Sequence, residues 1–302
     1  MRKLSRRRFL ETTLAATAGL AAWRAGAAPP DDLVDVSGSD PKAMVAAALS
    51  ALGGIGRFVR PGDYVVLKPN AGFANPPSWA TTTHPDVVAA VARACLEAKA
   101  KQVTVVEFPL GKGGKCLERC GLSAALASLP EVKVKVLGSP SDFQRVQVPG
   151  GVALKSVDVA KVVLSADVLF DLPVAKAHGQ TGVSFGLKNS MGLILDRTAF
   201  HQMLDLDQAI ADLGLVVKPH LTLLDATRAL LTNGPSGPGE TAAPGRIVAG
   251  RAVASVDAYG LGLARFNQRQ LRPADVRHIA LAGRAGLGET DVARLRVRKV
   301  AA

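Results

Sequence analysis

The sequence predicts an α/β protein with an open, mostly parallel β-sheet and helices on both faces. The 302 residues are 48% hydrophobic and only 21% charged, so the chain can bury a sizeable core and is not a disordered segment. Aromatic residues make up 4%, and Ala, Val, Leu and Gly dominate, which favours buried strands between helices over an all-β sandwich. Short apolar runs alternate with Ala-rich runs, which is the pattern of strand–loop–helix units joined by right-handed crossovers.

We divide the chain into an export signal at 1–27, a linker with an N-terminal helix at 28–59, and a single α/β domain at 60–302. Residues 5–10 resemble a twin-arginine motif of the form S-R-R-x-F-L, and a small-x-small cleavage site follows at 25–27. The apolar run between them has about ten residues, too few for a membrane span of about 20. We therefore expect the twin-arginine translocase to export the folded protein to the periplasm, rather than a membrane anchor or a free basic arm. No stable membrane span is expected after cleavage.

The elements follow one another along the chain with clear turn residues between them. Residues 28–40 are predicted to be a polar linker, and Asp40 and Pro41 form the N-cap and first position of a helix over 41–59. Strands are expected at 64–67, 103–107, 132–137, 145–148, 168–172, 220–224, 247–254 and 295–300. Further helices are expected at 85–98, from the loop 110–115 to about 129, and at 157–165, 200–217, 256–266 and 274–281. The strand at 145–148 is expected to form a hairpin with 153–154.

Polar residues stand where four predicted strands end, namely Lys68 and Asn70, Glu107, Lys176 and His178, and Asp225. Because the carboxyl ends of parallel strands share one edge of a sheet, where ligands bind, we expect a mixed-charge site there. Each residue alone has a structural alternative: Lys68 as a solvated strand end, and Glu107 or Asp225 as a turn or helix cap.

Residues 166–201 form the stretch around which this site is organised. They begin as a buried strand, break at Pro173, and then bring Lys176, His178, Lys188, Asn189 and His201 close together in sequence among glycines. A lone His is more often a structural hydrogen-bonding residue, and this alternative covers His84, His220 and His278.

Each candidate residue has an expected role. We predict His178, Lys176 and Glu107 as catalytic residues, and Lys68, Asn70, Lys188, Asn189 and Asp225 as residues that hold a cofactor or an anion. His178 and His201, with nearby carboxylates at Asp171, Asp196 or Asp205, are candidate ligands of a divalent metal, although their spacing is not diagnostic. Residues 182–191 would present backbone N–H groups to an anion at a helix start.

Charge and cysteine content exclude several classes of function. The net charge is +12, and much of it lies in residues 1–27; no basic stripe interleaved with aromatic residues follows, so no nucleic-acid partner is expected. Dinucleotide, P-loop and serine-hydrolase motifs are missing. Cys95 is expected to be a core thiol. Cys116 and Cys120 are either free thiols or, in an oxidising compartment, a disulfide that the spacing within one helix would strain. The three cysteines provide no iron–sulfur or zinc spacing.

The chain resembles the uncharacterised family known as domain of unknown function 362, over about residues 60–300. The matching elements are Lys68-Pro69-Asn70, Pro173 with Lys176 and His178, Lys188-Asn189 with Gly192 and then His201, Asp225, Asn233-Gly234-Pro235 with Gly237, and Asp257. The chain departs from the pattern at Ala226, where Gly is usual, and at Arg251-Ala252, where Asp-Pro is usual. Some relatives carry ferredoxin-type segments, whose cysteines this chain lacks.

The resemblance implies the fold and the site but no reaction, because the family has no settled activity. The layout is also similar to that of the lactate-racemase family, whose nickel cofactor is held by Lys and His. We expect an exported enzyme that uses a metal or another cofactor on a small anionic substrate. The alternatives are a non-catalytic periplasmic protein that binds a carboxylate or phosphate, and a maturation factor for exported redox enzymes.

Overall fold

The computed structural model describes residues 32–302, which form a mixed, mostly parallel sheet of 11 strands with helices on both faces. The strand order is β13-β1-β12-β10-β7-β2-β3-β4, and β7, β2, β3 and β4 run parallel to β10. These strands are β1 (Leu33–Ser37), β2 (Tyr64–Pro69), β3 (Gln102–Glu107), β4 (Val132–Val136), β7 (Val168–Leu172), β10 (Leu221–Leu230), β12 (Arg246–Gly250) and β13 (Val297–Ala301). The predicted α/β class is confirmed.

Shorter strands extend this sheet beside β10. They are β8 (Val174–His178), which runs parallel to β10, β9 (Gly182–Val183) and β11 (Thr241–Ala242), while β5 (Phe143–Gln147) and β6 (Ser156–Ala160) form a separate hairpin. The helices are α2 (Pro41–Ala51), α3 (Pro85–Glu97), α4 (Gly113–Arg119), α5 (Leu122–Leu126), α6 (Lys161–Leu164), α7 (Phe185–Asn189), α8 (Arg197–Gln202), α9 (Leu206–Leu213), α10 (Val253–Gly260) and α11 (Arg277–Arg284). Short 3₁₀ turns lie at Ile55–Arg57, Pro77–Trp79, Pro140–Asp142, Ser190–Leu193, Leu261–Leu263, Pro273–Asp275 and Val292–Arg294.

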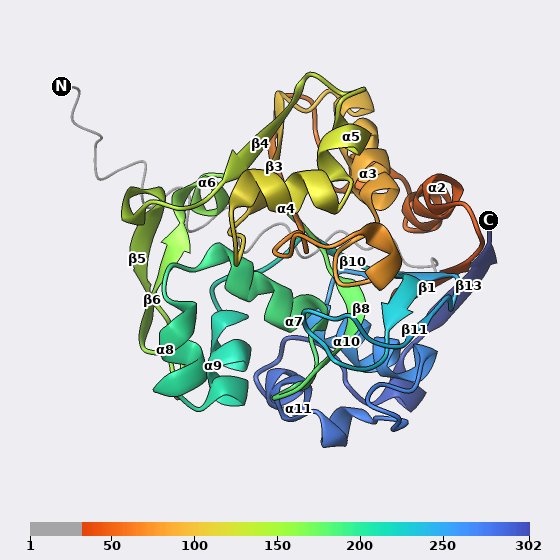
Figure 1. Cartoon of the computed structure of the whole chain (residues 1–302). Helices are drawn as coiled ribbons and strands as arrows, with labels where there is room; N and C mark the ends of the chain where they lie inside the picture. Colours follow the sequence, from red (N-terminus) through yellow and green to blue (C-terminus); the bar gives the residue numbers. More distant parts are fainter. Residues whose placement is uncertain (1–31) are drawn as a thin grey trace, which may run out of the picture. The chain divides into compact units, whose positions relative to one another are not determined.

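Two apolar cores lie on the two faces of the sheet. Along β2, Val65 and Leu67 pack with α2 and α3, while Val66 belongs to the core formed with α7, α9, α10 and α11. This alternation follows from the pleat, which points successive side chains to opposite faces. Figure 1 shows α2 and α3 on one side of the strands and α10 and α11 on the other. Both faces are therefore covered, as parallel sheets require.

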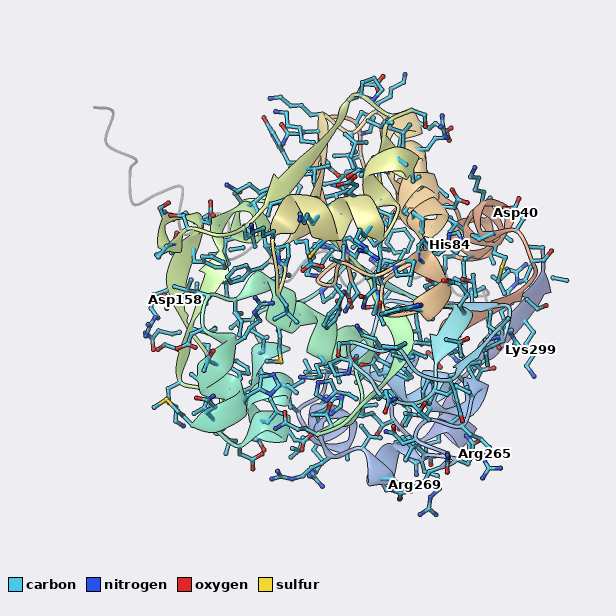
Figure 2. The ribbon with its side chains drawn as sticks, in the orientation of Figure 1. Asp40, His84, Asp158, Arg265, Arg269 and Lys299 are labelled. Carbon is cyan, nitrogen blue, oxygen red and sulfur yellow. The ribbon has the colours of Figure 1, made fainter. Side chains whose placement is uncertain are left out.

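The start of α2 matches the prediction, but its end does not. The Asp40 side chain accepts a hydrogen bond from the Lys42 backbone N–H at 3.0 Å, and Pro41 is the first helical residue (Figure 2). The helix ends at Ala51 rather than at residue 59, because Gly53 and Gly54 have φ of 92° and 88°. Positive φ is incompatible with a continuing helix and is easily adopted by glycine.

The predicted linker at 28–40 is wrong over Leu33–Ser37. These residues form β1, which lies between β12 and β13 in the sheet. Leu33, Val34 and Val36 have no solvent exposure. The sequence pattern concealed the strand because Asp35 interrupts the apolar run. The Asp35 carboxylate is buried against Arg246 of β12 and accepts a hydrogen bond from the Tyr259 hydroxyl at 2.6 Å.

Three predicted helices are also corrected. Residues 156–160 form β6 before the short α6 begins, and β6, not 153–154, is the hairpin partner of β5. The helix predicted up to residue 129 is broken at Gly121, where φ is 80°. The helix predicted at 200–217 is divided into α8 and α9 because Asp205 caps α9.

Two observations concern export and membranes. Among residues 32–302, no helix is long and apolar enough to cross a membrane. The predicted twin-arginine motif lies outside the residues that the structure describes.

Candidate functional site

A cavity of about 550 Å³ lies at the carboxyl ends of the strands β2, β3 and β8. Eight of the nine predicted site residues line it: Lys68, Asn70, Glu107, Lys176, His178, Lys188, Asn189 and His201. The structure therefore brings together side chains from four separate regions of the chain, as expected for the carboxyl edge of a parallel sheet.

Lys68 and Glu107 form a buried ion pair at this edge. The Lys68 Nζ lies 3.0 Å from Glu107 Oε1, and both side chains are less than 5% exposed. Glu107 also accepts hydrogen bonds from the Ala71 and Phe108 backbone N–H groups at 2.6 and 2.9 Å. A Cβ on Gly192 would lie 2.6 Å from Lys68 Cε and 2.8 Å from Glu107 Oε1, so glycine at this position lets the pair pack against the backbone. Each charge is compensated by the other.

Lys176 is held by three oxygen acceptors. Its Nζ donates to the carbonyl oxygens of Thr81 and Pro235 at 2.6 and 3.3 Å and to Asn70 Oδ1 at 3.1 Å. The Nζ also lies 4.5 Å from the centre of the Phe73 ring. Burial lowers the pKa of Lys176 to about 7. We assign the ammonium form because three acceptors use all three of its N–H bonds, which leaves no lone pair for chemistry.

Two asparagines connect this lysine to the sheet. Asn70 Nδ2 donates to Asn189 Oδ1 at 3.1 Å, and Asn189 Nδ2 donates to Asp171 Oδ1 at 2.7 Å and to the Lys68 carbonyl oxygen at 3.1 Å. The sequence of donors and acceptors fixes which way both amides point. Asn70 therefore positions Lys176, and Asn189 connects Asn70 to Asp171 and to the Lys68 backbone.

His178 is a neutral imidazole in a defined orientation. Its Nδ1 accepts hydrogen bonds from the Gln180 and Thr181 backbone N–H groups at 3.2 and 3.3 Å, so the ring proton is assigned to Nε2. Burial, together with the nearby charge of Lys188, lowers the pKa of His178 to about 3. The ring is stacked on His201 with 6.3 Å between centroids. His201 Nδ1 lies 2.7 Å from Gln180 Oε1, which places its proton on Nδ1.

Lys188 differs from the other two lysines of the cavity. It is 8% exposed, and among residues 32–302 its Nζ makes one hydrogen bond, to the thioether Met191 Sδ at 3.4 Å. Burial lowers its pKa to about 8, and the charge of Asp207 partly opposes this shift. A thioether is a weak acceptor, so Lys188 is a buried amine without a strong partner.

The residues present do not fit a divalent metal held by protein ligands alone. With Nδ1 accepting two N–H bonds, the Nε2 of His178 carries a proton and is not a free ligand. Asp196 caps α8, Asp205 caps α9 and pairs with Arg277, and Asp171 is hydrogen-bonded to Asn189. Residues 32–302 contain no group of three His, Cys, Asp or Glu side chains arranged for a metal ion.

Asp225 and the start of α7 are placed differently from the prediction. Asp225 does not line the cavity; its carboxylate accepts from the His84 N–H at 2.7 Å and from the Thr227 N–H and hydroxyl. It lies in the middle of β10, which continues to Leu230 instead of ending at Asp225. The backbone N–H groups at the start of α7 are not offered to an anion, because Gly186 and Leu187 donate to Asp257 at 2.8 Å.

The remaining histidines and the cysteines have structural roles. His84 caps α3 through Asp86 N–H, His220 accepts from the Leu169 N–H, and His278 contacts Asp207 at 3.1 Å. Figure 2 shows His84 at the start of α3. Cys95, Cys116 and Cys120 are buried free thiols, so the strained disulfide is not formed.

Sequence reasoning missed several residues of the cavity. Arg197 donates to the Phe108 and Pro109 carbonyl oxygens at 2.8 and 3.3 Å, and its guanidinium lies 4.2 Å from the Phe108 ring centre. Its position inside the stretch 166–201 is the signal that could have indicated it. The apolar part of the lining is formed by Phe73, Phe108, Leu110, Met191, Leu195 and Pro235. Nothing in the local sequence pattern identifies these residues.

The fold and the cavity define an α/β protein with a ligand-sized pocket at the carboxyl edge of its parallel strands. The family model named Domain of unknown function (DUF362) matches residues 65–262, and the chain belongs to this family. It is 30% identical over 257 residues to Thylakoid-associated protein sll1697 from Synechocystis sp., covering 80% of this chain and 74% of that protein.

A solved structure, the lactate racemase apoprotein from Thermoanaerobacterium thermosaccharolyticum, is similar at 12% identity with a TM-score of 0.46. The match covers 67% of this chain, which spans 54% of that protein.

Proposed function

We propose that this protein is an exported enzyme that acts on a small organic carboxylate bound in the cavity. The observation that carries the proposal is the charge of the lining: among the described residues it contains four basic side chains, Lys68, Lys176, Lys188 and Arg197, and one acidic side chain, Glu107. A concave site with an excess of buried positive charge attracts and holds an anion.

The apolar lining favours an organic anion over a bare inorganic one. Phe73, Phe108 and Leu110 lie in the same cavity as Lys188 and His178, so a ligand with an apolar body and a charged end is complementary to it. The volume of about 550 Å³ is in the range of small-molecule sites. Lys188 and the Nε2–H of His178 donate to no oxygen of the described residues, so both are available to donate to the carboxylate.

The lowered pKa values of Lys188 and His178 favour catalysis over binding alone. Burial lowers the pKa of Lys188 to about 8 and of His178 to about 3, and perturbed groups gathered in one cleft are typical of catalytic sites. Because the donor set does not fit a metal held by protein ligands alone, we assign the chemistry to the lysine and histidine side chains. A non-catalytic binding protein is the second candidate, and the charge of the cavity supports it equally.

Export is supported by the sequence motif at residues 5–10 and the cleavage site after residue 27. The relative from Synechocystis sp. is named as thylakoid-associated, which is compatible with an extracytoplasmic or membrane-proximal location. We propose the periplasm as the location of the mature protein and the twin-arginine translocase as its partner during export.

The binding proposal is tested with variants of Lys188. In Lys188→Met the cavity loses the amine that has no oxygen acceptor, and we expect phenylacetate affinity to fall about 10- to 100-fold, the range for a hydrogen bond to a charged group. Lys188→Arg retains the charge and should retain most of the affinity. Thermal-shift titrations of the folded variants with phenylacetate, pyruvate and inorganic phosphate provide the measurement.

Equal affinity in the wild type and Lys188→Met would contradict the assignment of the site. Stabilisation by phosphate alone would replace the organic carboxylate with an inorganic anion.

A further inference from the structure

The three cavity lysines offer an internal comparison. Lys68 is paired with the Glu107 carboxylate at 3.0 Å, and Lys176 donates to three oxygens between 2.6 and 3.3 Å. In both environments oxygen acceptors occupy the N–H bonds of the amine, although burial lowers the pKa of Lys176 to about 7. Lys188, at 8% exposure, has no oxygen acceptor among the described residues and contacts only a thioether at 3.4 Å. Of the three, Lys188 alone has no oxygen acceptor among the described residues, so the lone pair of its neutral form is free to act as a nucleophile.

Neither Arg197 nor Asp207 gives Lys188 a hydrogen-bond acceptor. Arg197 lines the same cavity and keeps its positive charge, and its guanidinium is held in place by two carbonyl oxygens of the β3–α4 loop. The nearest acidic influence on Lys188 comes from Asp207, which is hydrogen-bonded to His278. Burial without a hydrogen-bonded carboxylate partner favours the neutral form of a lysine, which is its nucleophilic form.

We propose that Lys188 condenses with the carbonyl carbon of a 2-oxo carboxylate to form an imine. This inference rests on the proposed function, because the carboxylate of the substrate is bound by the positive cavity. The apolar residues Phe73 and Leu195 accommodate the rest of the molecule.

The reaction balances without an oxidant or a reductant. The Lys188 nitrogen attacks the carbonyl carbon, a C–N bond forms, and one amine proton moves to the carbonyl oxygen to give a carbinolamine. The C–O bond then breaks, and the hydroxyl leaves with the second amine proton as water. The Nε2–H of His178, which lines the same cavity, is a neutral donor available to hydrogen-bond the oxygen during these steps.

The test is reductive trapping on the full-length protein. Wild type is incubated with pyruvate and sodium cyanoborohydride, and the adduct is identified by intact mass spectrometry and peptide mapping. We expect one adduct per chain, located on Lys188. Lys188→Arg should bind pyruvate, as measured by thermal shift, and yield no adduct. Lys112→Arg, at an exposed lysine outside the cavity, is the matched control and should be trapped like wild type.

The outcomes separate this inference from the proposed function. Pyruvate binding without an adduct in wild type overturns imine formation and leaves the carboxylate site standing. An adduct that maps elsewhere, or that persists in Lys188→Arg, also overturns it. If neither pyruvate nor phenylacetate binds, both proposals fail.

Discussion

At the residue scale, the three lysines of the cavity differ because their hydrogen-bond acceptors differ. Lys68, Lys176 and Lys188 are each almost fully buried in one cavity, yet two are held by oxygens and one is not. The sequence predicted all three as site residues because they follow apolar strands or lie near glycines. It could not assign their roles, because the oxygens that hold Lys176 come from residues 70, 81 and 235, far away in the chain.

The pKa of Lys188 gives a pH dependence with a definite sign. Its value of about 8 means that Lys188 is an ammonium below this pH and a neutral amine above it. Affinity for phenylacetate, which stays ionised, should therefore be highest below pH 8 and decrease as the pH rises through it. Calorimetric titrations between pH 6.5 and 9.5 measure this, and Lys188→Arg should show no such decrease. A wild-type affinity independent of pH would refute the role of the ammonium.

Asp171 and Asp257 make a second residue-scale prediction. Both are fully buried, and a Cβ on Gly186 between them would lie 2.9 Å from Asp171 Oδ2 and 3.0 Å from Asp257 Oδ1. Asp171 Oδ2 has no hydrogen-bond partner among the described residues, and burial raises the pKa of Asp171 well above its usual value. We therefore expect Asp171 to be protonated, so that Asp171→Asn changes the free energy of unfolding by less than about 1 kcal/mol.

Asp257→Asn is the matched comparison, because Asp257 accepts from two backbone N–H groups. The side-chain amide of the variant has only one acceptor oxygen, so one of the two backbone N–H groups loses its acceptor, at a cost of about 1–3 kcal/mol. Urea unfolding of both variants at pH 8 measures the difference. Equal destabilisation by the two substitutions would show that Asp171 is ionised.

At the element scale, continuous apolar strands were predicted well and mixed ones were not. The runs that became β2, β3 and β7 lie between covered faces, so their central residues, at 65–67, 103–106 and 168–170, are mostly apolar and the pattern is clear. β1 was missed because Asp35 is buried with Arg246 and Tyr259, partners that local sequence does not reveal. Asp225 was misplaced for a related reason: β10 continues past it, so a residue expected at the strand end lies inside the strand.

Asp225 connects two elements of the fold. Its buried carboxylate joins β10 to the residue before α3 through His84 N–H at 2.7 Å and is contacted by Arg228 at 3.4 Å. Asp225→Asn replaces one acceptor oxygen with an NH₂ group, which then faces an N–H or O–H donor. We therefore expect a loss of about 1–3 kcal/mol in the free energy of unfolding. Phenylacetate affinity of the folded variant should equal that of wild type. A large loss of affinity with unchanged stability would restore Asp225 to the binding site.

At the scale of the whole molecule, the site depends on the order of strands in the sheet. β2 and β3 are neighbours, β7 pairs with β2, and β8 continues after β7 beside β10, so Lys68 and His178, which are 110 positions apart in sequence (178 − 68), share one edge. The rule that ligands bind at the carboxyl edge predicted this meeting. The tautomers, the lining aromatics and Arg197 depend on packing and could not be predicted from local pattern.

Export makes a prediction of its own. Changing Arg6 and Arg7 together to Lys should abolish accumulation in the periplasm, because the twin-arginine pair is the recognised feature of the motif. Fractionation of cells that produce the full chain, with Arg24→Lys as a control outside the motif, measures the effect. Normal periplasmic accumulation of the Arg6→Lys/Arg7→Lys protein would contradict the proposed route.

The central claim is that the cavity binds an organic carboxylate through its excess of positive charge. The most direct measurement is a calorimetric titration of the wild-type protein at pH 7 with phenylacetate and, separately, with its neutral amide, phenylacetamide. We predict saturable binding of phenylacetate with one ligand per chain and an affinity for phenylacetamide at least about tenfold lower, since the amide lacks the charge that strengthens hydrogen bonds to Lys188. Equal binding of both compounds, or binding of neither, would contradict the claim.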